Sequence, residues 1–308
     1  MTAPAAATEH GTSFACLGGR TAVIASGEYA EALLSVTRSR LERSHRALTR
    51  FDRTSELSVL NANPLSHVRV SDVMYRFVDA AADAARRTGG LVDPTLVAEI
   101  ETAGYRGDLE DFVSLEQSLA AVPGRSPARP HPDARWARVG TDPGGRMVVR
   151  PPGVKLDSGG VAKGLLADIA GDSLADCACY VVDCCGDLRL GGSDSIERTV
   201  RVDDPFGRGV LHEFELAEGG VATSGIGRRA WVGPDGRPAH HLLDPSTGRP
   251  AYTGIVQATA LAPTAAEAEW RAKAALLGGP WSAGDWLGHG CVLVFDDGTH
   301  VVMDAPAR

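Results

Sequence analysis

Residues 156–176, LDSGGVAKGLLADIAGDSLAD, place a carboxylate, two glycines and a lysine directly before an apolar helical pattern. Leu165, Leu166 and Ile169 recur at the spacing of one helix face, so the glycines lie at the start of that helix. Free N–H groups and the positive dipole end at a helix N-terminus favour an anion, and glycines let a ligand approach the main chain closely. The segment therefore predicts an anion site. A glycine turn between a strand and a helix is the structural alternative.

The polar residues of this segment restrict which ligands it can bind. Lys163 supplies a mobile positive charge, whereas Asp157 would repel a phosphate unless a cation or a hydroxyl lies between them. The phosphate loop GxxxxGK[ST] is absent here, and so is the dinucleotide pattern GxGxxG. Neither of these two common nucleotide sites is expected.

Strand and helix patterns are mixed on both sides of this segment, without a strict strand–helix–strand order. Strands are predicted over residues 20–25, 146–150, 180–184, 199–202 and 255–262, and a final hairpin over 291–304 turns at Asp297-Gly298. Helices are predicted over residues 28–48, from an N-cap at Ser71 to Gly89-Gly90, over 161–175 and over 265–277. Residues 180–192 look like one buried strand and residues 123–135 like a surface loop. This order favours an α+β fold over a doubly wound parallel sheet.

Length and composition indicate one globular unit. With 308 residues, 44% of them hydrophobic, we expect a single large domain or two intimate subdomains. Residues 1–12 are expected to be disordered, and residues 13–308 to form the domain. The net charge of −8 disfavours nucleic-acid binding. The sequence contains neither a secretory signal pattern nor an apolar run long enough to span a membrane, so we expect a cytoplasmic protein.

Four of the six cysteines fall between Cys177 and Cys185. Their spacing, CxCxxxxCC, does not match the paired ligands of zinc sites, which lie two to four residues apart. Because they flank an apparent buried strand and free cysteine packs as a small apolar residue, core packing is favoured. A metal or redox role stays open as the alternative.

A histidine precedes a turn in residues 239–254, AHHLLDPSTGRPAYTG. Pro245 and Gly248 build the turn, and histidine is the side chain suited to proton transfer near neutral pH. His241 is therefore a candidate general base. A hydrogen-bonded structural histidine is the alternative.

Residues 264–279, TAAEAEWRAKAALLGG, begin with the capping pattern of Thr264 and Glu267. Glu269 and Lys273 lie four residues apart, on one side of the predicted helix. An exposed ion pair that contributes a few tenths of a kcal/mol is the structural alternative to a role in a site.

Taken in order, the motifs of this chain resemble those of the ApbE family, the FAD:protein FMN transferases. The segments are FDRTSELSVLN (51–61), TGGLVDPT (88–95), LDSGGVAKG (156–164), CCGDL (184–188), VATSG (221–225), HLLDPSTGRP (241–250) and AEAEWRAKA (266–274). The resemblance runs from about Phe14 to Cys291. It implies cleavage of FAD at its pyrophosphate and transfer of FMN to a Thr or Ser hydroxyl of an acceptor flavoprotein, with release of AMP and assistance by magnesium.

The resemblance also implies a single domain of two intimate α+β subdomains with the flavin site between them, and it implies the residues of that site. The glycine loop with Asp157 and Lys163 would hold the FAD diphosphate, and His241 falls on the catalytic position. The main-chain carbonyl of Ala162 and the carboxylate of Glu269 fall on magnesium positions. Further contacts to FAD are implied for Leu17, Phe51, Leu91, Val92, Asp93, Gly159, Leu165 and Leu243.

Two positions depart from the family pattern. Glu269 replaces an aspartate and Lys273 replaces a threonine, both of which bind magnesium in the family. A protonated lysine cannot bind a metal. We expect the Lys273 ammonium to lie near the diphosphate, to replace part of the charge of the cation and to weaken the magnesium dependence. Ser158, where the family commonly has leucine, is a small change that the fold should tolerate.

Three functions are compatible with these residues. Transfer of FMN to a protein is the leading hypothesis. A homologue that binds or hydrolyses FAD without transfer, because its metal site is altered, is the first alternative. A protein without flavin, whose cysteines bind zinc or iron, is the second.

Overall fold

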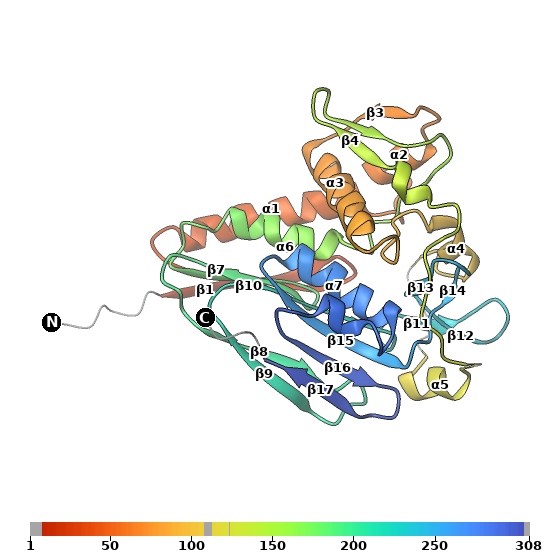
Figure 1. Ribbon diagram of the computed structural model, residues 1–308. Coiled ribbons are helices and arrows are strands. Elements are labelled where there is room, and N and C mark those ends of the chain that lie inside the picture. The colour runs from red at the N-terminus through yellow and green to blue at the C-terminus, as the bar shows by residue number, and fades with distance from the viewer. Residues whose placement is uncertain (1–7, 108–112, 123, 305–308) are drawn as a thin grey trace.

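The computed structural model describes residues 8–107, 113–122 and 124–304. Its centre is an eight-stranded sheet in the order β1-β2-β6-β7-β10-β15-β16-β17 (Figure 1). The strands are β1 (Glu9–Cys16), β2 (Gly19–Ser26), β6 (Cys179–Cys184), β7 (Asp187–Gly191), β10 (Gly219–Gly225), β15 (Ile255–Ala262), β16 (Cys291–Phe295) and β17 (His300–Met303). All neighbouring strands of this sheet are antiparallel, which confirms the α+β class.

Three long helices cover one face of this sheet (Figure 1). They are α1 (Ala30–Leu48), α6 (Ala162–Asp172) and α7 (Ala265–Gly278). The leucines that recur every seven residues along α1, Leu34, Leu41 and Leu48, are all buried. Helices α6 and α7 approach so closely that a Cβ at Gly164 would lie 2.4 Å from the main-chain oxygen of Ala265, so only glycine fits there.

A smaller group of elements lies beyond α1 and α6. Helix α3 (Asp72–Arg87) packs there with a three-stranded sheet in the order β3-β5-β4. These strands are β3 (His67–Arg69), β4 (Gly140–Asp142) and β5 (Met147–Val149). The Ser71 hydroxyl accepts a hydrogen bond from the Met74 N–H (3.3 Å), which confirms the predicted N-cap of α3.

The remaining elements are short. They are α2 (Glu56–Ala62), α4 (Val97–Thr102), α5 (Leu115–Ala120), the 3-10 helices η1 (Arg135–Arg138) and η2 (Ala283–Trp286), and the strands β8 (Arg198–Asp203), β9 (Val210–Leu216), β11 (Ala230–Val232), β12 (Pro238–His240), β13 (Leu243–Asp244) and β14 (Arg249–Pro250). Strands β8 and β9 form a hairpin on the side of the main sheet away from α6 and α7 (Figure 1). Within the described residues, no helix is long and apolar enough to cross a bilayer.

Most predicted elements are confirmed, and two are corrected. Residues 180–192 form two strands rather than one, because Cys185 and Gly186 have φ of 60° and 94° and make the tight turn of the β6–β7 hairpin. Residues 9–12 belong to β1, paired with β2, and are not disordered as expected for 1–12; residues 1–7 lie outside the described part. The hairpin predicted over 291–304 and the helices at α1, α6 and α7 are confirmed.

The cysteines pack mainly in the core. All six are free thiols, and five of them are buried: Cys16, Cys177, Cys179, Cys184 and Cys291. Core packing, the favoured interpretation, is confirmed for these five. Across the described ranges, no group of three or more His, Cys, Asp or Glu side chains is arranged to hold a metal ion.

Candidate functional site

A cavity of about 1850 Å³ opens at the N-terminus of α6. The glycine loop reaches it through Asp157 and Gly159, and α6 through Ala162 and Lys163. Lys273 of α7 and His241, which follows β12, line the same cavity. The fold thus brings the glycine loop, the predicted base and the lysine of the late helix around one space.

The carboxylate of the glycine loop is used within the protein. Asp157 Oδ2 pairs with Arg50 Nε at 2.7 Å, and Asp157 Oδ1 accepts a hydrogen bond from the Gly159 N–H at 2.8 Å. The loop is also tied to α1, since the Ser158 hydroxyl donates to the Leu48 carbonyl (2.8 Å). Arg50 neutralises the charge that would otherwise repel a phosphate. The pairing therefore removes the conflict that Asp157 posed in the sequence.

Behind the loop, four charged side chains form a buried cluster, here called the charge cluster: Lys163, Asp187, Glu269 and Lys273. Lys163 pairs with Asp187, and Lys273 Nζ donates to Glu269 Oε1 at 2.8 Å. Lys163 Nζ also lies 3.8 Å from Glu269 Oε1, and Glu269 Oε2 accepts from the Gly164 N–H at 2.8 Å. The two carboxylate side chains are each only 1% exposed, so the cluster balances two cations against two anions inside the protein.

The pKa shifts follow from this arrangement. Burial opposes ionisation of Glu269, but Lys273 and Lys163 outweigh it and lower its pKa. Burial raises the pKa of Asp187, although Lys163 opposes that shift. Burial also acts against the charge of Lys163, yet Asp187 and Glu269 raise its pKa above the ordinary value. Glu269 is thus held as an anion between two ammonium groups.

The residues implied for magnesium do not fit a resident divalent ion. Both oxygens of Glu269 already accept hydrogen bonds, one of them from the Lys273 ammonium. Lys273 replaces a possible third ligand and places a positive charge where a cation would have to bind. Ala162 lines the cavity but offers only its main-chain oxygen. A metal ion would have to displace an ammonium group from a buried carboxylate, which is unfavourable.

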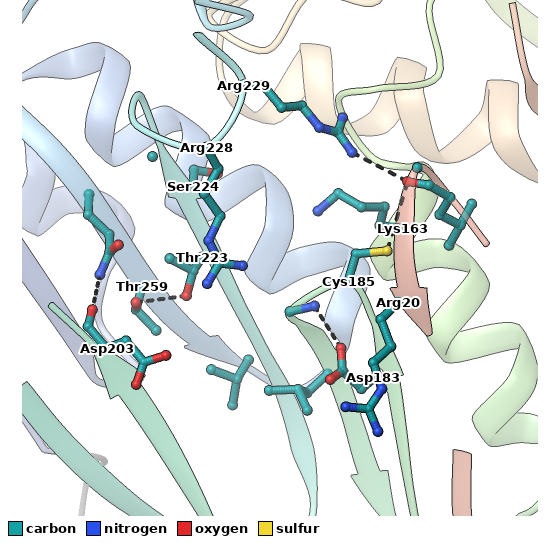
Figure 2. A pocket seen from close by; sticks show the side chains of 18 of the residues that line it. Arg20, Lys163, Asp183, Cys185, Asp203, Thr223, Ser224, Arg228, Arg229 and Thr259 are labelled. Atoms are coloured by element: carbon teal, nitrogen blue, oxygen red, sulfur yellow. Dashed lines mark hydrogen bonds between the residues drawn. The ribbon is translucent and has the colours of Figure 1, made fainter. Parts of the chain in front are cut away.

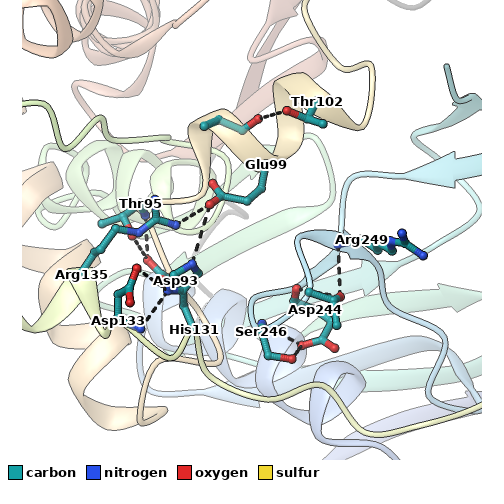
Figure 3. A network of polar contacts seen from close by, with 12 residues as sticks. Asp93, Thr95, Glu99, Thr102, His131, Asp133, Arg135, Asp244, Ser246 and Arg249 are labelled. Atoms are coloured by element: carbon teal, nitrogen blue, oxygen red, sulfur yellow. Dashed lines mark hydrogen bonds and ion pairs between the residues drawn. The ribbon is translucent and has the colours of Figure 1, made fainter.

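His241 is placed by the strands before it and the turn after it. The main-chain N–H of His241 donates to the Arg229 carbonyl (3.3 Å). The turn that follows is closed by Asp244, whose Oδ1 accepts a hydrogen bond from the Ser246 N–H (3.0 Å, Figure 3). Burial, and next the guanidinium of Arg229, lower the pKa of His241 well below its usual value. Its Nδ1 is buried and lacks a hydrogen-bond partner within the described residues, so Nε2 is the ring nitrogen available to the cavity. The imidazole is neutral near pH 7, as a proton acceptor must be.

Two arginines of the cavity had no signal in the sequence patterns. Arg228 and Arg229 follow β10, and both line the cavity (Figure 2). Arg229 Nη2 donates to the carbonyl of Leu17 at 3.3 Å, which ties this loop to the turn between β1 and β2. Eight Lys or Arg side chains and five Asp side chains line the cavity, although the whole chain has a net charge of −8. The excess of positive charge suits an anionic ligand.

Leu17 and Phe51, two of the positions implied to contact FAD, line the cavity. The ring of Phe51 is 45% exposed and lies 4.4 Å from the Arg50 guanidinium carbon and 5.4 Å from the Tyr105 ring, edge to face. Tyr105 in turn stacks on Trp231 with ring centroids 5.2 Å apart. Phe51 and Tyr105 therefore form an aromatic wall of the cavity that is suited to a planar ring system, and the buried Trp231 supports Tyr105 from behind.

The other implied contacts lie outside the lining of the cavity. Val92, Leu165 and Leu243 are buried, and Leu91 is half-buried. Val92 nevertheless lies beside the glycine loop, since a Cβ at Gly160 would be 3.6 Å from its Cγ1.

Asp93 belongs to a separate polar network with Thr95, Glu99, His131 and Arg135 (Figure 3). Its Oδ1 accepts from the Thr95 hydroxyl at 2.6 Å, and its Oδ2 is buried with no partner in the described chain. Burial raises the pKa of Asp93. The five implied contacts at Leu91, Val92, Asp93, Leu165 and Leu243 are therefore not brought to the cavity surface in this structure.

Comparison with known proteins identifies similar chains. The FAD:protein FMN transferase of Treponema pallidum is 28% identical over 245 residues, which make up 71% of this chain and 64% of that protein. The FAD:protein FMN transferase of Vibrio cholerae is 27% identical over 233 residues, 72% of this chain and 66% of that protein. The matched part thus spans slightly less than two thirds of these relatives.

Solved structures share the fold. The crystal structure of the ApbE protein from Thermotoga maritima superimposes with a TM-score of 0.78 at 26% identity, covering 96% of this chain and 97% of that one. The apo form of the flavinyl transferase ApbE from Pseudomonas stutzeri gives a TM-score of 0.75 at 21% identity, over 97% and 95% of the two chains, and shows the fold alone. The sequence profile of the ApbE family matches residues 17–293. This chain belongs to the ApbE family.

Proposed function

We propose that this protein transfers FMN from FAD to a Thr or Ser hydroxyl of an acceptor protein and releases AMP. One observation carries the proposal: a neutral His241 and the glycine loop at the start of α6 line the same positively charged cavity. Membership of the ApbE family and the relatives named FAD:protein FMN transferase support it.

The chemistry assigns a step to each group. The acceptor hydroxyl oxygen attacks the phosphorus of the FMN half of FAD, and the pyrophosphate P–O bond breaks, so the bridging oxygen leaves with AMP. His241 Nε2 takes the hydroxyl proton. Negative charge spreads over the phosphate oxygens during transfer, and Lys163, Lys273 and the first turn of α6 are placed to stabilise it. We further propose that two α+β subdomains enclose the bound FAD.

A magnesium ion has no role in this scheme. The positive charge that magnesium would bring to the phosphates is supplied by Lys273, which is held by Glu269 at the edge of the cavity. Transfer measured with EDTA and with added magnesium should then differ by less than about twofold. A large magnesium requirement, on the order of the 10–100-fold that metal-site changes produce, would reject the assignment of Lys273.

The altered cluster also favours one alternative, an FAD-hydrolysing homologue that uses water in place of an acceptor. Incubation with FAD and candidate acceptor proteins separates the two functions. A mass gain of one FMN on a Thr or Ser of the acceptor supports transfer. Release of FMN and AMP with every acceptor unmodified supports hydrolysis.

The base assignment is tested with His241→Asn. Transfer should fall by about 10²–10⁴-fold, the usual contribution of a general base, while FAD still binds. His289→Asn, at an exposed position outside the cavity, is the matched control and should retain activity. A His241→Asn protein that transfers FMN at close to the unaltered rate would show that another group accepts the proton.

A further inference from the structure

Strand β10 of the main sheet is paired along nearly its full length on one side but only over its first residues on the other. This strand pairs with β15 from Gly220 to Gly225, but with β7 only from Gly219 to Val221. Strand β7 goes no further, because at Asp187 the chain enters the turn to β6. Residues 222–225 of β10 therefore have a strand neighbour on one side only, as far as the described strands show.

This open edge lies inside the cavity of the candidate site. Thr223, Ser224 and Gly225 line it together with Lys163 and His241. Figure 2 shows Thr223 and Ser224 on one side of the gap, and Lys163, Cys185 and Asp183 on the other. An edge strand with a free side offers main-chain N–H and C=O groups to another extended chain.

Beyond the edge, the cavity continues under the sheet as far as the β8–β9 hairpin. Leu188, Leu190 and Val221 line it on the sheet side, and Val200 and Val202 on the hairpin side. The hairpin is held against the sheet, since Gln257 Nε2 donates to the Asp203 carbonyl at 2.9 Å. Beside the edge, the hydroxyls of Thr223 and Thr259 lie 2.8 Å apart.

The volume of the cavity exceeds the need of one small ligand. Pockets for small molecules and cofactors are usually about 300–1,000 Å³, whereas this cavity measures about 1850 Å³. A second reactant therefore has room beside FAD. The proposed reaction requires a second reactant, and its hydroxyl must reach the space in front of His241.

We propose that the acceptor polypeptide docks in an extended conformation along the open edge of residues 222–225, as an added strand, and presents its Thr or Ser to His241. The inference rests on the proposed function. Strand addition takes its affinity from main-chain hydrogen bonds and its selectivity from pockets for alternate side chains. The acceptor would thus be recognised mainly by its extended backbone and by small residues around the target.

Hydrogen exchange tests the docking site directly. The probe is a peptide that surrounds the modified residue of an acceptor, with alanine in place of the target Thr or Ser, added to the protein saturated with FAD. Amide exchange in the fragment with residues 222–225 should slow by about tenfold or more, as expected for edge amides that gain hydrogen bonds. Binding without protection of this fragment, or protection only around the exposed Trp281, would overturn the proposal.

A steric variant gives a second readout. Thr223→Trp fills the gap, so the KM for the acceptor peptide should rise by about tenfold or more, while the Kd for FAD changes little. Val301→Trp, at an exposed position of β17, is the matched control and should change neither constant.

The outcomes separate this proposal from the proposed function. An unchanged acceptor KM in Thr223→Trp, with transfer intact in the unaltered protein, rejects the docking site alone. Loss of FAD binding in this variant places the flavin at the edge and also rejects it. If the unaltered protein modifies no acceptor, the proposed function and the docking site are both rejected.

Discussion

The charge cluster and the pair His240–His241 lie on different elements, and Lys163, Lys273 and His241 line the same cavity, yet the cluster is charged and the histidines are neutral near pH 7. Lys163 and Glu269 stay charged because each has partners of opposite sign within 4 Å, which raise the pKa of Lys163 and lower that of Glu269. Within the described residues no ion pair involves His240, and burial lowers its pKa to about 3, although the main chain of Ala251 opposes that shift. Burial alone does not decide protonation; the neighbouring partner does. One wall of the cavity therefore holds fixed charges and the other holds a neutral base.

The largest effect is expected when the charge cluster loses one member. Lys273→Met leaves Glu269 buried with a weaker partner, Lys163 at 3.8 Å, and should lower the free energy of unfolding by about 3–5 kcal/mol. Urea unfolding at pH 7 measures the change. The exposed pair Arg38–Glu42 has the same four-residue spacing, so Arg38→Met is a matched control and should cost less than about 1 kcal/mol. Equal losses in the two variants would mean that burial does not strengthen the pair at Lys273.

A smaller effect on stability is expected from His240, and it depends on pH. The unfolded chain protonates His240 below about pH 6.5, whereas the folded protein does so only near pH 3, so stability is complete above pH 6.5 and falls as the pH drops through this window. At about 1.4 kcal/mol per pH unit, His240 should remove roughly 2–3 kcal/mol between pH 7 and pH 4.5.

His240→Phe tests this dependence and keeps a ring beside Tyr252, whose centroid lies 4.9 Å from that of His240. The unfolding free energy of each protein is measured by denaturant titration at pH 7 and at pH 4.5. The loss between the two pH values should be roughly 2–3 kcal/mol smaller in His240→Phe than in the unaltered protein. Parallel pH profiles for the two proteins would assign the acid sensitivity to other groups.

The smallest effect is expected when the Glu269–Lys273 pair is converted into a magnesium site. Glu269→Asp combined with Lys273→Thr removes the internal ammonium and supplies two oxygen ligands. Magnesium binding should then become measurable by calorimetry, and transfer should fall by about tenfold in EDTA. The single variant Glu269→Asp keeps Lys273 and is the control that should gain no magnesium binding. Calorimetric binding of magnesium by the unaltered protein would contradict the role given to Lys273.

Local patterns were sufficient for most of the fold. The N-caps at Ser71 and Thr264 and the apolar periodicity of α1 and α6 are short-range signals, so those helices were predictable. The β6–β7 turn was not, because a cysteine occupies one of its two left-handed positions, where glycine or asparagine would have given a signal.

Only those site residues that belong to a recognisable sequence motif could be predicted. The glycine loop, His241 and Lys273 were placed together by resemblance, and the structure brings them to one cavity. The Arg50–Asp157 pair and the approach of Arg229 to Leu17 join segments that are distant in the sequence, and no local pattern encodes them. The open edge of β10 is equally invisible, because it depends on where a neighbouring strand stops.

The contact between Gly164 and Ala265 has a consequence for how substrates enter. Since not even a methyl group fits between these helices, and Glu269 also accepts a hydrogen bond from the Gly164 amide, separating α6 from α7 would break a close-packed contact and a buried hydrogen bond. In the proposed reaction, FAD is therefore not expected to enter by separation of these two helices. Any opening of the cavity is left to the hairpins and loops that form its other walls, so in the proposed reaction FAD would enter and AMP would leave on that side.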